Sequence, residues 1–402
     1  MKRNKLIQTS LSLFLAGSLL GCASKQVSSV EEQTSQVEEE ALTATIKVWA
    51  SKEDLKEDGW LEKEFKAFEK AHPKWEITFE IEEVSENEVV NKMNEDTENV
   101  ADVYFYTNDQ IPTLVNSKML AEIGGETLQE MNKNNVQTIV DSITYNEATY
   151  GIPSSEDTWF MYYDKRVFSS DDVSNLEKML KKGKVGFPVT SAKYLSAFYS
   201  ANGCNWTNGN MDFNSDKAIA VTNYLVDLVK NNNFVNYYAE DAYASMLAEG
   251  KINALFSDSK DYDTIVSALG EENVGVIAAP TYTLNGQTLQ LKATTTIKVI
   301  GINPNSKSIK AAVALANFLG SEESQLVHFE TNHVLPVDSS PTLEEDSLFF
   351  NQLDNINHAR MIVQPTDSNM ASVWTSFEQK GKDLMSGSVT KTNTSTSTDA
   401  PQ

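Results

Sequence analysis

The sequence predicts an α/β protein divided into two lobes. Apolar residues alternate with period two at 45–50 and 76–81, whereas they recur every three to four residues at 59–71. Such alternation of strand and helix is typical of right-handed parallel crossovers. Between the two polar ends of the chain lie about 340 residues, more than one ordinary hydrophobic core contains. We therefore expect two cores.

The first block predicts a parallel sheet with polar loops at one edge. Strands are predicted at 45–50, 76–81 and 100–106, with helices at 59–71 and 87–94 between them. Pro73 ends the first of these helices. In such sheets ligands bind beyond the carboxyl ends of the strands. Those ends are the loops 51–54 and 107–110, which we expect to contact a ligand.

A second α/β block follows the first. Its first strand, 159–163, is apolar without interruption, which predicts burial on both faces. Further strands are predicted at 184–189, 252–256, 274–278 and 296–302, and helices at 217–231, at 240–249 and from 307 onward. Asn214 or Ser215 can cap the first of these helices, and Gly250 suits a left-handed end of the second.

The two ends of the chain differ in composition from the segment between them. Residues 1–21 begin with cationic side chains and continue with an apolar run too short to span a bilayer, the pattern of a signal peptide. The run ends in Leu19-Leu20-Gly21-Cys22, which resembles a bacterial lipobox and implies acylation of Cys22. The alternative is an ordinary signal peptide with an incidental cysteine. Residues 22–43 and 387–402 are polar and lack aromatic residues, so we expect a disordered tether and a disordered tail.

Composition and motifs argue against several classes of function. The formal net charge is −24 at pH 7, whereas nucleic-acid binding needs a basic surface. No Gly-Lys pair is followed by Ser or Thr, so there is no P-loop, and no G-x-S-x-G motif occurs. The four histidines lack metal-ligand spacing, and we expect them at the surface or at helix caps. We therefore expect neither an enzyme nor a cofactor or metal site.

Seven short segments occur in a distinctive order. They are Val48-Trp49-Ala50, Ala101-Asp102-Val103, Tyr150-Gly151-Ile152-Pro153, Tyr163-Asp164-Lys165, the run from Tyr224 to Lys230, Ala278-Ala279-Pro280-Thr281 and Gly301-Ile302-Asn303. In this order and spacing they resemble the maltose/maltodextrin-binding branch of the extracellular solute-binding proteins. The resemblance extends over residues 44–387.

The resemblance implies a two-lobe periplasmic-binding-protein fold with discontinuous lobes and a ligand cleft at the hinge. Projected onto this chain, the N-lobe comprises 44–155 and 300–345, and the C-lobe comprises 159–296 and 351–386. The family captures an oligosaccharide, here a malto-oligosaccharide, closes around it and delivers it to the permease subunits of an ABC transporter. It also implies a monomer, lipid-anchored at the extracellular face of the cell membrane.

The resemblance further implies which residues contact the ligand. Trp374, on a late helix, matches a stacking tryptophan, although it also fits an apolar face with Met370 and Phe377. Further expected contacts are Tyr106, Asp109, Asp157, Glu53, Asp54 and Tyr194. The alternatives are strand-end packing for Tyr106, a helix cap for Asp109, and ordinary solvated side chains for the other acids.

Three positions depart from the family pattern. Lys260, with Tyr262 two residues later, stands where a second stacking tryptophan is expected. Gln110 and Glu378 stand where basic residues are expected. These departures change the expected chemistry of the cleft and leave the exact sugar open.

Other functions remain open on the sequence alone. The ligand can be another oligosaccharide or a non-sugar such as a polyamine, which Asp109, Asp157 and Glu378 would surround. The chain can also be a surface lipoprotein that binds insoluble starch, or a glycosidase that uses two of its 57 acidic residues.

Overall fold

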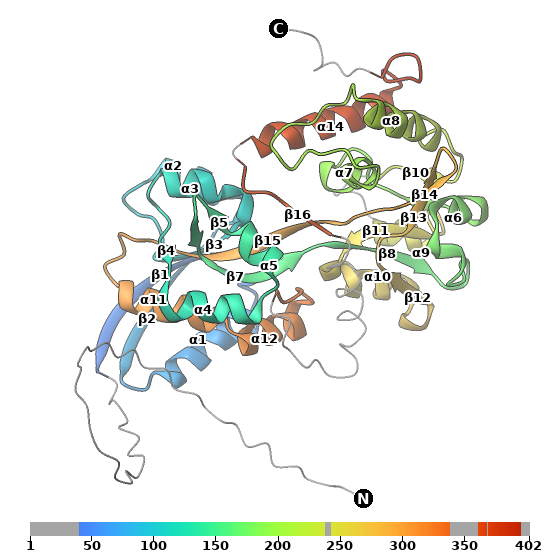
Figure 1. Ribbon diagram of the computed structural model, residues 1–402. Coiled ribbons are helices and arrows are strands. Elements are labelled where there is room, and N and C mark those ends of the chain that lie inside the picture. The colour runs from blue at the N-terminus through green and yellow to red at the C-terminus, as the bar shows by residue number, and fades with distance from the viewer. Residues whose placement is uncertain (1–39, 238–242, 338–360, 368, 395–402) are drawn as a thin grey trace, which may run out of the picture.

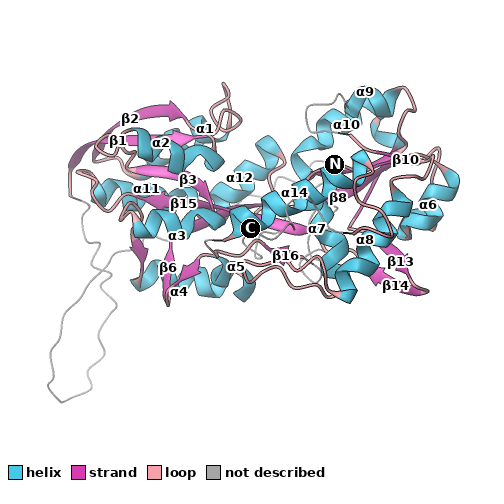
Figure 2. Ribbon diagram, turned by 90° about the horizontal axis from the view of Figure 1, so that it is seen from above, coloured by secondary structure: helices cyan, strands magenta, loops and turns pink. Residues whose placement is uncertain are grey.

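The computed structural model describes residues 40–237, 243–337, 361–367 and 369–394, and it shows two lobes side by side (Figure 1). Strands pass from one lobe into the other, and the view from above shows helices covering the sheets of both lobes (Figure 2). The predicted two-lobe α/β fold is confirmed. The expected signal peptide, Cys22 and the tether up to residue 39 lie outside the described residues.

The N-lobe is built on a mixed sheet with the strand order β16-β15-β3-β1-β2, and β7 pairs with β15. These strands are β1 (Leu42–Ala50), β2 (Trp75–Glu83), β3 (Val103–Thr107), β7 (Ile152–Asp157), β15 (Thr294–Ile302) and β16 (Ile362–Val363). β1 is parallel to both β2 and β3, as the crossovers predict. β15 is antiparallel to β3 and to β7.

Helices and a small second sheet surround this N-lobe sheet. The helices are α1 (Trp60–Ala71), α2 (Val89–Glu95), α3 (Ile111–Asn116), α4 (Gly125–Asn134), α5 (Gln137–Ser142), α11 (Ile309–Leu319) and α12 (Glu322–Asn332). The second sheet consists of β4 (Glu122–Ile123), β6 (Ala148–Tyr150) and β5 (Thr144–Tyr145). α1 buries Leu61, Phe65 and Phe68, the face that the periodicity predicts.

The C-lobe is built on a five-stranded sheet with the order β10-β9-β11-β8-β12. These strands are β8 (Trp159–Asp164), β9 (Val185–Gly186), β10 (Phe234–Val235), β11 (Ala254–Asp258) and β12 (Val274–Ile277), and a hairpin adds β13 (Thr281–Leu284) and β14 (Gln287–Gln290). The helices are α6 (Leu176–Lys182), α7 (Ala192–Ala201), α8 (Asp216–Leu228), α9 (Tyr243–Ala248), α10 (Tyr262–Leu269) and α14 (Met370–Ser386). β8 lies between β11 and β12, and all six of its residues are buried, as the uninterrupted apolar run predicts.

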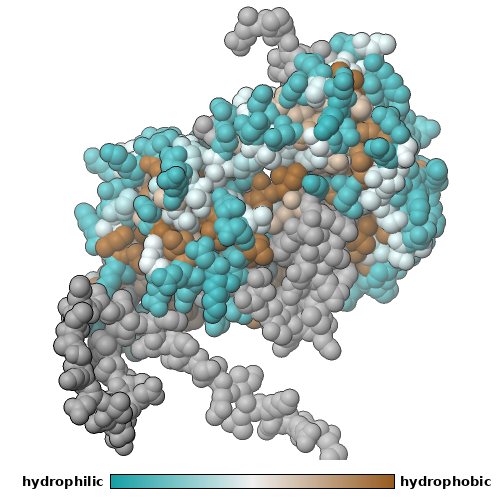
Figure 3. All heavy atoms as spheres, in the orientation of Figure 1, coloured by the Kyte–Doolittle hydropathy of each residue, from teal (hydrophilic) through white to brown (hydrophobic). Residues whose placement is uncertain are grey.

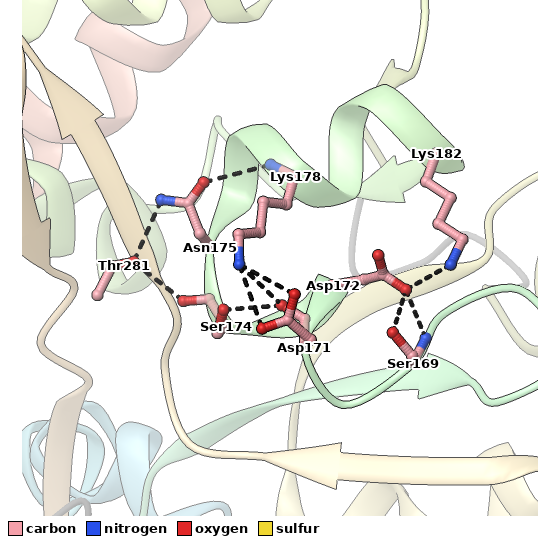
Figure 4. Close-up of polar contacts among 8 residues, drawn as sticks. All are labelled: Ser169, Asp171, Asp172, Ser174, Asn175, Lys178, Lys182 and Thr281. Carbon is pink, nitrogen blue, oxygen red and sulfur yellow. Dashed lines mark hydrogen bonds and ion pairs between the residues drawn. The ribbon is translucent and has the colours of Figure 1, made fainter.

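Polar side chains fix several helix starts in the C-lobe. Asn175 caps α6 by accepting from the backbone N–H of Lys178, and its amide donates to Thr281 at 3.2 Å, which ties α6 to β13 (Figure 4). Of the two predicted caps of α8, Ser215 is the one that accepts a bond from the helix, at 3.4 Å. Gly250 has φ +67°, the left-handed conformation expected after α9.

Several boundaries differ from the predictions, including the following three. β1 begins at Leu42, so the last two residues of the expected tether belong to a strand. The expected strand 184–189 is only Val185–Gly186, because the chain turns at Pro188. The expected disordered tail is ordered as far as residue 394: Val389 is buried, and the backbone of 390 pairs with that of 393.

Buried apolar residues form one large core in each lobe and a smaller third cluster. The N-lobe core joins residues 46–152 with residues 297–337, and the C-lobe core joins residues 159–293 with residues 370–389. The third cluster joins residues 160–276 with Phe329 and Leu335. The chain therefore crosses between the lobes along β7 into β8, along β15, and along the segment that contains β16.

Candidate ligand-binding site

The strands that join the lobes carry polar side chains on one face. β7 and β15 pair so that Asp157 lies opposite Thr296 and Ser155 lies opposite Lys298. Residues opposite each other in a pair of strands point to the same face, as do residues two apart. β3 extends this face, because Thr107 also lies opposite Lys298. We call these five residues the crossing-strand face.

Lys193 links this face to the C-lobe. It lies in the first turn of α7, and its Nζ is 3.0 Å from Asp157 Oδ1 and 2.8 Å from Asp258 Oδ1. The hydroxyl of Tyr194 donates to the same Asp258 oxygen at 3.4 Å. The side chains of Lys193, Asp157 and Asp258 are 21%, 29% and 16% exposed. One cation therefore holds the ends of β7 and β11 together at a place that water reaches.

The two carboxyl groups respond differently to this environment. Burial alone would raise the pKa of Asp157, but Lys193, Lys260 and Lys298 outweigh it, so the pKa is lowered. Burial and the charge of Asp157 raise the pKa of Asp258 to about 6, although Lys193 and Lys260 oppose the shift. At neutral pH both groups are ionised, and Asp258 is the one that takes up a proton on mild acidification.

On the N-lobe side the crossing-strand face meets two acidic residues. Lys298 Nζ donates to Glu86 Oε1 at 2.8 Å, and Glu86 begins the short helix η1 (Glu86–Glu88). Burial would raise the pKa of Asp54, but the His328 ring, followed by Lys298 and Ser51, lowers it to about 2. Lys298 therefore neutralises acidic groups on both sides of the hinge.

Two polar atoms near this face have no hydrogen-bond partner within the described part of the chain. They are Ser155 Oγ and Asp109 Oδ1, and both are shielded from solvent. Asp109 follows β3 in η2 (Asn108–Gln110), where burial raises its pKa and hydrogen bonds with Thr107 and Gln364 partly offset the rise. Unpaired buried polar atoms are uncommon in folded proteins. Both atoms therefore have hydrogen-bonding capacity that the described residues leave unused.

Gln364 connects the crossing-strand face to a cavity of about 370 Å³ between the lobes. Its Oε1 accepts a hydrogen bond from Thr296 Oγ1 at 2.7 Å. The cavity is lined by Thr138, Asp141, Ser142, Thr207, Met361, Val363, Gln364, Pro365 and Thr366. Figure 3 shows apolar, brown atoms between the teal surfaces of the two lobes. A volume of this size is at the lower end of small-molecule sites.

Tyr106 lies in the N-lobe core and not at the cleft. It is fully buried, and its hydroxyl donates to the carbonyl of Tyr150 at 3.1 Å. Side chains alternate along a strand, so the inward direction of Tyr106, opposite Val299, follows from the outward direction of Thr107. The expectation that Tyr106 contacts a ligand is therefore corrected: Tyr106 packs in the core beneath the strand, as the alternative interpretation had it.

Asp54 and His328 form a buried pair instead of facing solvent. Asp54 is 3% exposed; its Oδ1 lies 2.7 Å from His328 Nε2 and accepts from Asn332, while its Oδ2 accepts from Ser51. The expectation that every histidine lies at the surface or at a cap fails here, because His328 is 3% exposed and stacks on Trp60 at 3.8 Å between ring centroids. Asp54 therefore braces the first loop, and its neighbour Glu53 is the exposed acid of that loop.

The aromatic residues expected to stack on a ligand lie on the C-lobe. Trp374 is partly buried near the start of α14, with its ring centroid 5.0 Å from that of the fully buried Trp206. Glu378 is one turn further along α14 and is exposed. Tyr194 is also partly buried, 5.5 Å from the ring of Trp159. These rings contact the C-lobe core on one side and leave part of their surface open.

The predicted site residues thus fall into two groups. Asp157, Tyr194 and Lys260 come together around Asp258, where Lys260 is exposed and acts on both carboxylates through its charge. Trp374 packs against Trp206 instead, Glu378 is exposed one turn further along α14, and Glu53 is exposed in the first loop. Tyr262 begins α10 and lies 5.8 Å, between ring centroids, from His333 at the end of α12.

Five functional candidates escaped the sequence analysis. They are Glu86, Ser155, Lys193, Asp258 and Lys298. Lys298 carried a usable signal, because it is a lone cation in the otherwise uncharged strand 294–302. Lys193 directly precedes the predicted Tyr194, whereas nothing local distinguishes Glu86 or Ser155 from other polar residues.

The arrangement suits binding of a neutral polar molecule. Amine donors and carboxylate acceptors alternate around the crossing-strand face, and a hydroxyl group can donate to one and accept from the other. Within the described residues, no group of three or more His, Cys, Asp or Glu side chains is placed to hold a metal ion. No helix of the described part is long and apolar enough to cross a membrane.

Comparison with known proteins places these features in context. The family model of the bacterial extracellular solute-binding proteins matches residues 63–347. A structure solved with acarbose is 39% identical, covers 88% of this chain and 96% of its own, and superposes with a TM-score of 0.79. No match was found among curated proteins.

Two more distant structures agree in fold. The maltodextrin-binding protein MalE1 of L. casei BL23, solved without ligand, is 20% identical over 87% of this chain and 95% of its own, with a TM-score of 0.79. A cyclo/maltodextrin-binding protein complexed with maltotetraose is 18% identical over 86% and 93%, with a TM-score of 0.72. At these identities the likeness shows the fold alone.

Proposed function

The chain belongs to the bacterial extracellular solute-binding proteins, an extracytoplasmic family, and from this premise we propose that it is the substrate-binding component of an ABC importer for malto-oligosaccharides. In this proposal the ligand binds between an N-lobe of 44–155 and 300–345 and a C-lobe of 159–296 and 351–386. The lobes close around it by a hinge motion of the crossing strands, and the closed form is delivered to the permease. The chain acts as a monomer and as a receptor, with no catalytic step.

The crossing-strand face is the observation that carries the proposal. It lies where the two cores meet, and it offers Ser155 Oγ and Asp109 Oδ1 without partners beside Lys193 and Lys298. Each hydroxyl of a sugar is both a donor and an acceptor, so neighbouring hydroxyls can satisfy carboxylates and amines at once. The ligand acarbose in the 39% identical relative supports a sugar of the maltodextrin class.

Aromatic stacking completes the proposed site. A pyranose ring has apolar faces, which Trp374 and Tyr194 are proposed to cover from the C-lobe. A micromolar dissociation constant corresponds to about 8 kcal/mol. Two stacks at about 1 kcal/mol each and three hydrogen bonds to charged groups at about 2 kcal/mol each supply that order of magnitude. We include Asp157, Glu53, Lys260, Tyr262 and Glu378 as further proposed contacts.

Membrane attachment through Cys22 is part of the proposal. The support is the sequence Leu19-Leu20-Gly21-Cys22 after an apolar run, together with the extracytoplasmic family. Two or three acyl chains hold a protein stably, whereas one holds it only marginally. The receptor would therefore stay at the extracellular face of the cell membrane, close to its permease.

A polyamine receptor is the second candidate, because Asp157 and Asp258 share one cation and Asp109 follows β3, whose Thr107 belongs to the crossing-strand face. Lys193 already pairs with Asp157 and Asp258, and Lys298 pairs with Glu86. A polyamine would have to displace these cations and leave them unpaired, which is costly in a partly buried site. The geometry therefore favours the sugar.

The deciding experiment is an isothermal titration calorimetry series. The chain is titrated separately with maltotriose, maltotetraose, cellotetraose, a xylo-oligosaccharide and spermidine. We expect a heat of binding with the α-linked sugars alone. The same sugars alone should decrease the radius of gyration that small-angle scattering measures. Ser155→Ala should weaken binding, whereas the matched control Ser169→Ala should not, because Ser169 is an exposed serine whose hydroxyl donates to Asp172 (Figure 4). Spermidine binding without sugar binding would overturn the proposal, as would retention by granular starch without any soluble ligand.

A further inference from the structure

A corner of the N-lobe far from the cleft combines exposed apolar and basic side chains. Ile309 and Val313 lie one turn apart on α11 and are 42% and 38% exposed. Lys310 Nζ lies 5.8 Å above the ring of Trp75, and Lys74 and Lys307 are exposed beside them. We call Lys74, Trp75, Lys307, Ile309, Lys310 and Val313 the corner patch. Its aromatic member is a type of residue that favours the boundary between lipid and water.

The charge of this corner departs from that of the chain. The whole protein carries −24, but the 48 residues 274–321, which include α11, contain no Asp or Glu. Two acids lie at this corner: Glu40, 4.0 Å from Lys310, and Glu76, which follows Trp75. An anionic surface would repel most of this molecule, so it would face such a surface preferentially with this corner.

The chain enters the fold at the same corner. Trp75 Nε1 donates to the backbone carbonyl of Glu40 at 3.2 Å, and Lys310 forms the ion pair with the Glu40 side chain. Seventeen residues, 23–39, separate Glu40 from Cys22. Seventeen residues span at most about 60 Å even when fully extended. An acylated Cys22 would therefore keep the corner patch close to the bilayer at a high effective concentration.

The position of the patch leaves the cleft free. Trp75 pairs with Leu42 at the amino end of β1, whereas the ligand loops follow its carboxyl end at Ala50. Nine strand residues separate these ends by roughly 25 Å. A surface that contacts the patch therefore does not cover the crossing-strand face.

We propose that the corner patch rests on the anionic lipid surface of the cell membrane and sets the orientation of the N-lobe beside the permease. The proposal rests on the lipid anchor of the proposed function. The apolar side chains enter the interface, and the three lysines lie at the level of the lipid phosphates. The acyl chains supply attachment, and the patch supplies orientation.

The test uses the lipidated chain, purified from membranes and inserted into vesicles. A fluorescent probe sensitive to polarity is attached to Val313→Cys in a Cys204→Ser background, and the matched control is Met385→Cys on the C-lobe helix α14, which is 39% exposed. Vesicles are pure phosphatidylcholine or contain phosphatidylglycerol at about one third, and brominated lipids quench probes that reach the interface. We expect quenching at 313 to exceed that at 385 about threefold or more on anionic vesicles alone.

The triple variant Lys74→Glu, Lys307→Glu and Lys310→Glu should reduce quenching at 313 to the level at 385 while flotation with the vesicles and affinity for maltotetraose stay unchanged. Equal quenching at the two positions on anionic vesicles would overturn the proposal. A change at 313 that needs the permease would also overturn it, in favour of a protein partner. Failure of the chain to float would refute the lipid anchor itself, and unchanged quenching in the triple variant would refute the role of the lysines.

Discussion

Replacing Lys193 with methionine tests whether the interlobe ion pairs are structural as well as functional. The substitution keeps the length of the side chain and removes the cation that binds Asp157 at 3.0 Å and Asp258 at 2.8 Å. Two carboxylates then face each other at the hinge, with Lys260 and Lys298 as the remaining nearby cations. We expect a large loss of stability at pH 8.

The size of the loss follows from burial. Removing one partner of a fully buried ion pair costs about 3–5 kcal/mol. The side chains here are 16–29% exposed, so water replaces part of the lost interaction and we expect about 2–3 kcal/mol. The matched control is Lys178→Met in α6, whose pair with Asp171 at 3.2 Å has exposures of 49% and 87% (Figure 4). Such surface pairs contribute below about 1 kcal/mol.

The loss should depend on pH in a defined direction. Without Lys193 the pKa of Asp258 rises further above its value of about 6, so the folded state binds a proton more readily than the unfolded state. Stability then rises as the pH falls through the folded pKa towards the unfolded value of about 4. The deficit of the variant should therefore shrink between pH 8 and pH 5, and Asp258→Asn in the same chain should recover part of it at pH 8.

Urea unfolding followed by tryptophan fluorescence at both pH values measures these effects. A deficit that is the same at pH 8 and pH 5 would refute the unpaired carboxylates as its cause. A deficit no larger than that of Lys178→Met would show that the interlobe pairs contribute no more than surface pairs.

Three further predictions concern binding and attachment. Acidification from pH 7.5 to 5.5 should weaken oligosaccharide binding up to about tenfold, because protonation of Asp258, whose pKa is about 6, removes one charged hydrogen-bond acceptor from the site, and Asp258→Asn should abolish the pH dependence; a flat profile of the unmodified chain in calorimetry contradicts this. Trp374→Ala should raise the dissociation constant about tenfold with a small change in melting temperature, whereas Trp206→Ala, fully buried, should cost about 3–5 kcal/mol of stability; the reverse ranking would make Trp374 the core residue. Cys22→Ser should release the chain from membranes or leave an uncleaved precursor, and unchanged partitioning into detergent contradicts the lipid anchor.

The fold was predictable wherever local pattern and tertiary packing agree. The alternation in β1 and β2 and the helical spacing of α1 identify the parallel sheet. α1 buries the predicted face, and in β2 Ile77 and Phe79 are partly buried between exposed neighbours, although Ile81 is 48% exposed. The ordered segment after α14 was not predictable, since its order comes from distant contacts. Lys391 pairs with Asp227 of α8, and the buried Lys380 donates to the carbonyl of Thr394 at 2.6 Å. Neither partner is visible in the local composition.

The sequence pointed to the candidate site and to some of its residues, such as Asp157 and Tyr194, and missed others. The carboxyl ends of β1 and β3 and the crossing strand β7 were expected to surround a ligand, and the charged groups do lie there. Tyr106 differs by one residue from Thr107, and in a strand one residue is enough to reverse the side chain. Lys298 reaches Glu86 across 212 positions of sequence, a relation that only the pairing of β15 reveals.

A ligand that binds at the hinge must replace ion pairs that already exist there. Any ligand group that reaches Lys193 or Lys298 competes with a carboxylate that the lysine already holds at 3.0 Å or less. The free energy of binding is favourable only if the ligand also forms a hydrogen bond with the displaced carboxylate. A buried charge that is left unpaired costs more free energy than one hydrogen bond contributes. Adjacent hydroxyls of a sugar can bind both the lysine and the carboxylate, because each hydroxyl both donates and accepts a hydrogen bond. A polyamine only donates, so it binds the carboxylates and leaves the lysines without a partner. The alternation of charge thus selects for polyhydroxyl compounds even before the aromatic rings distinguish one sugar from another.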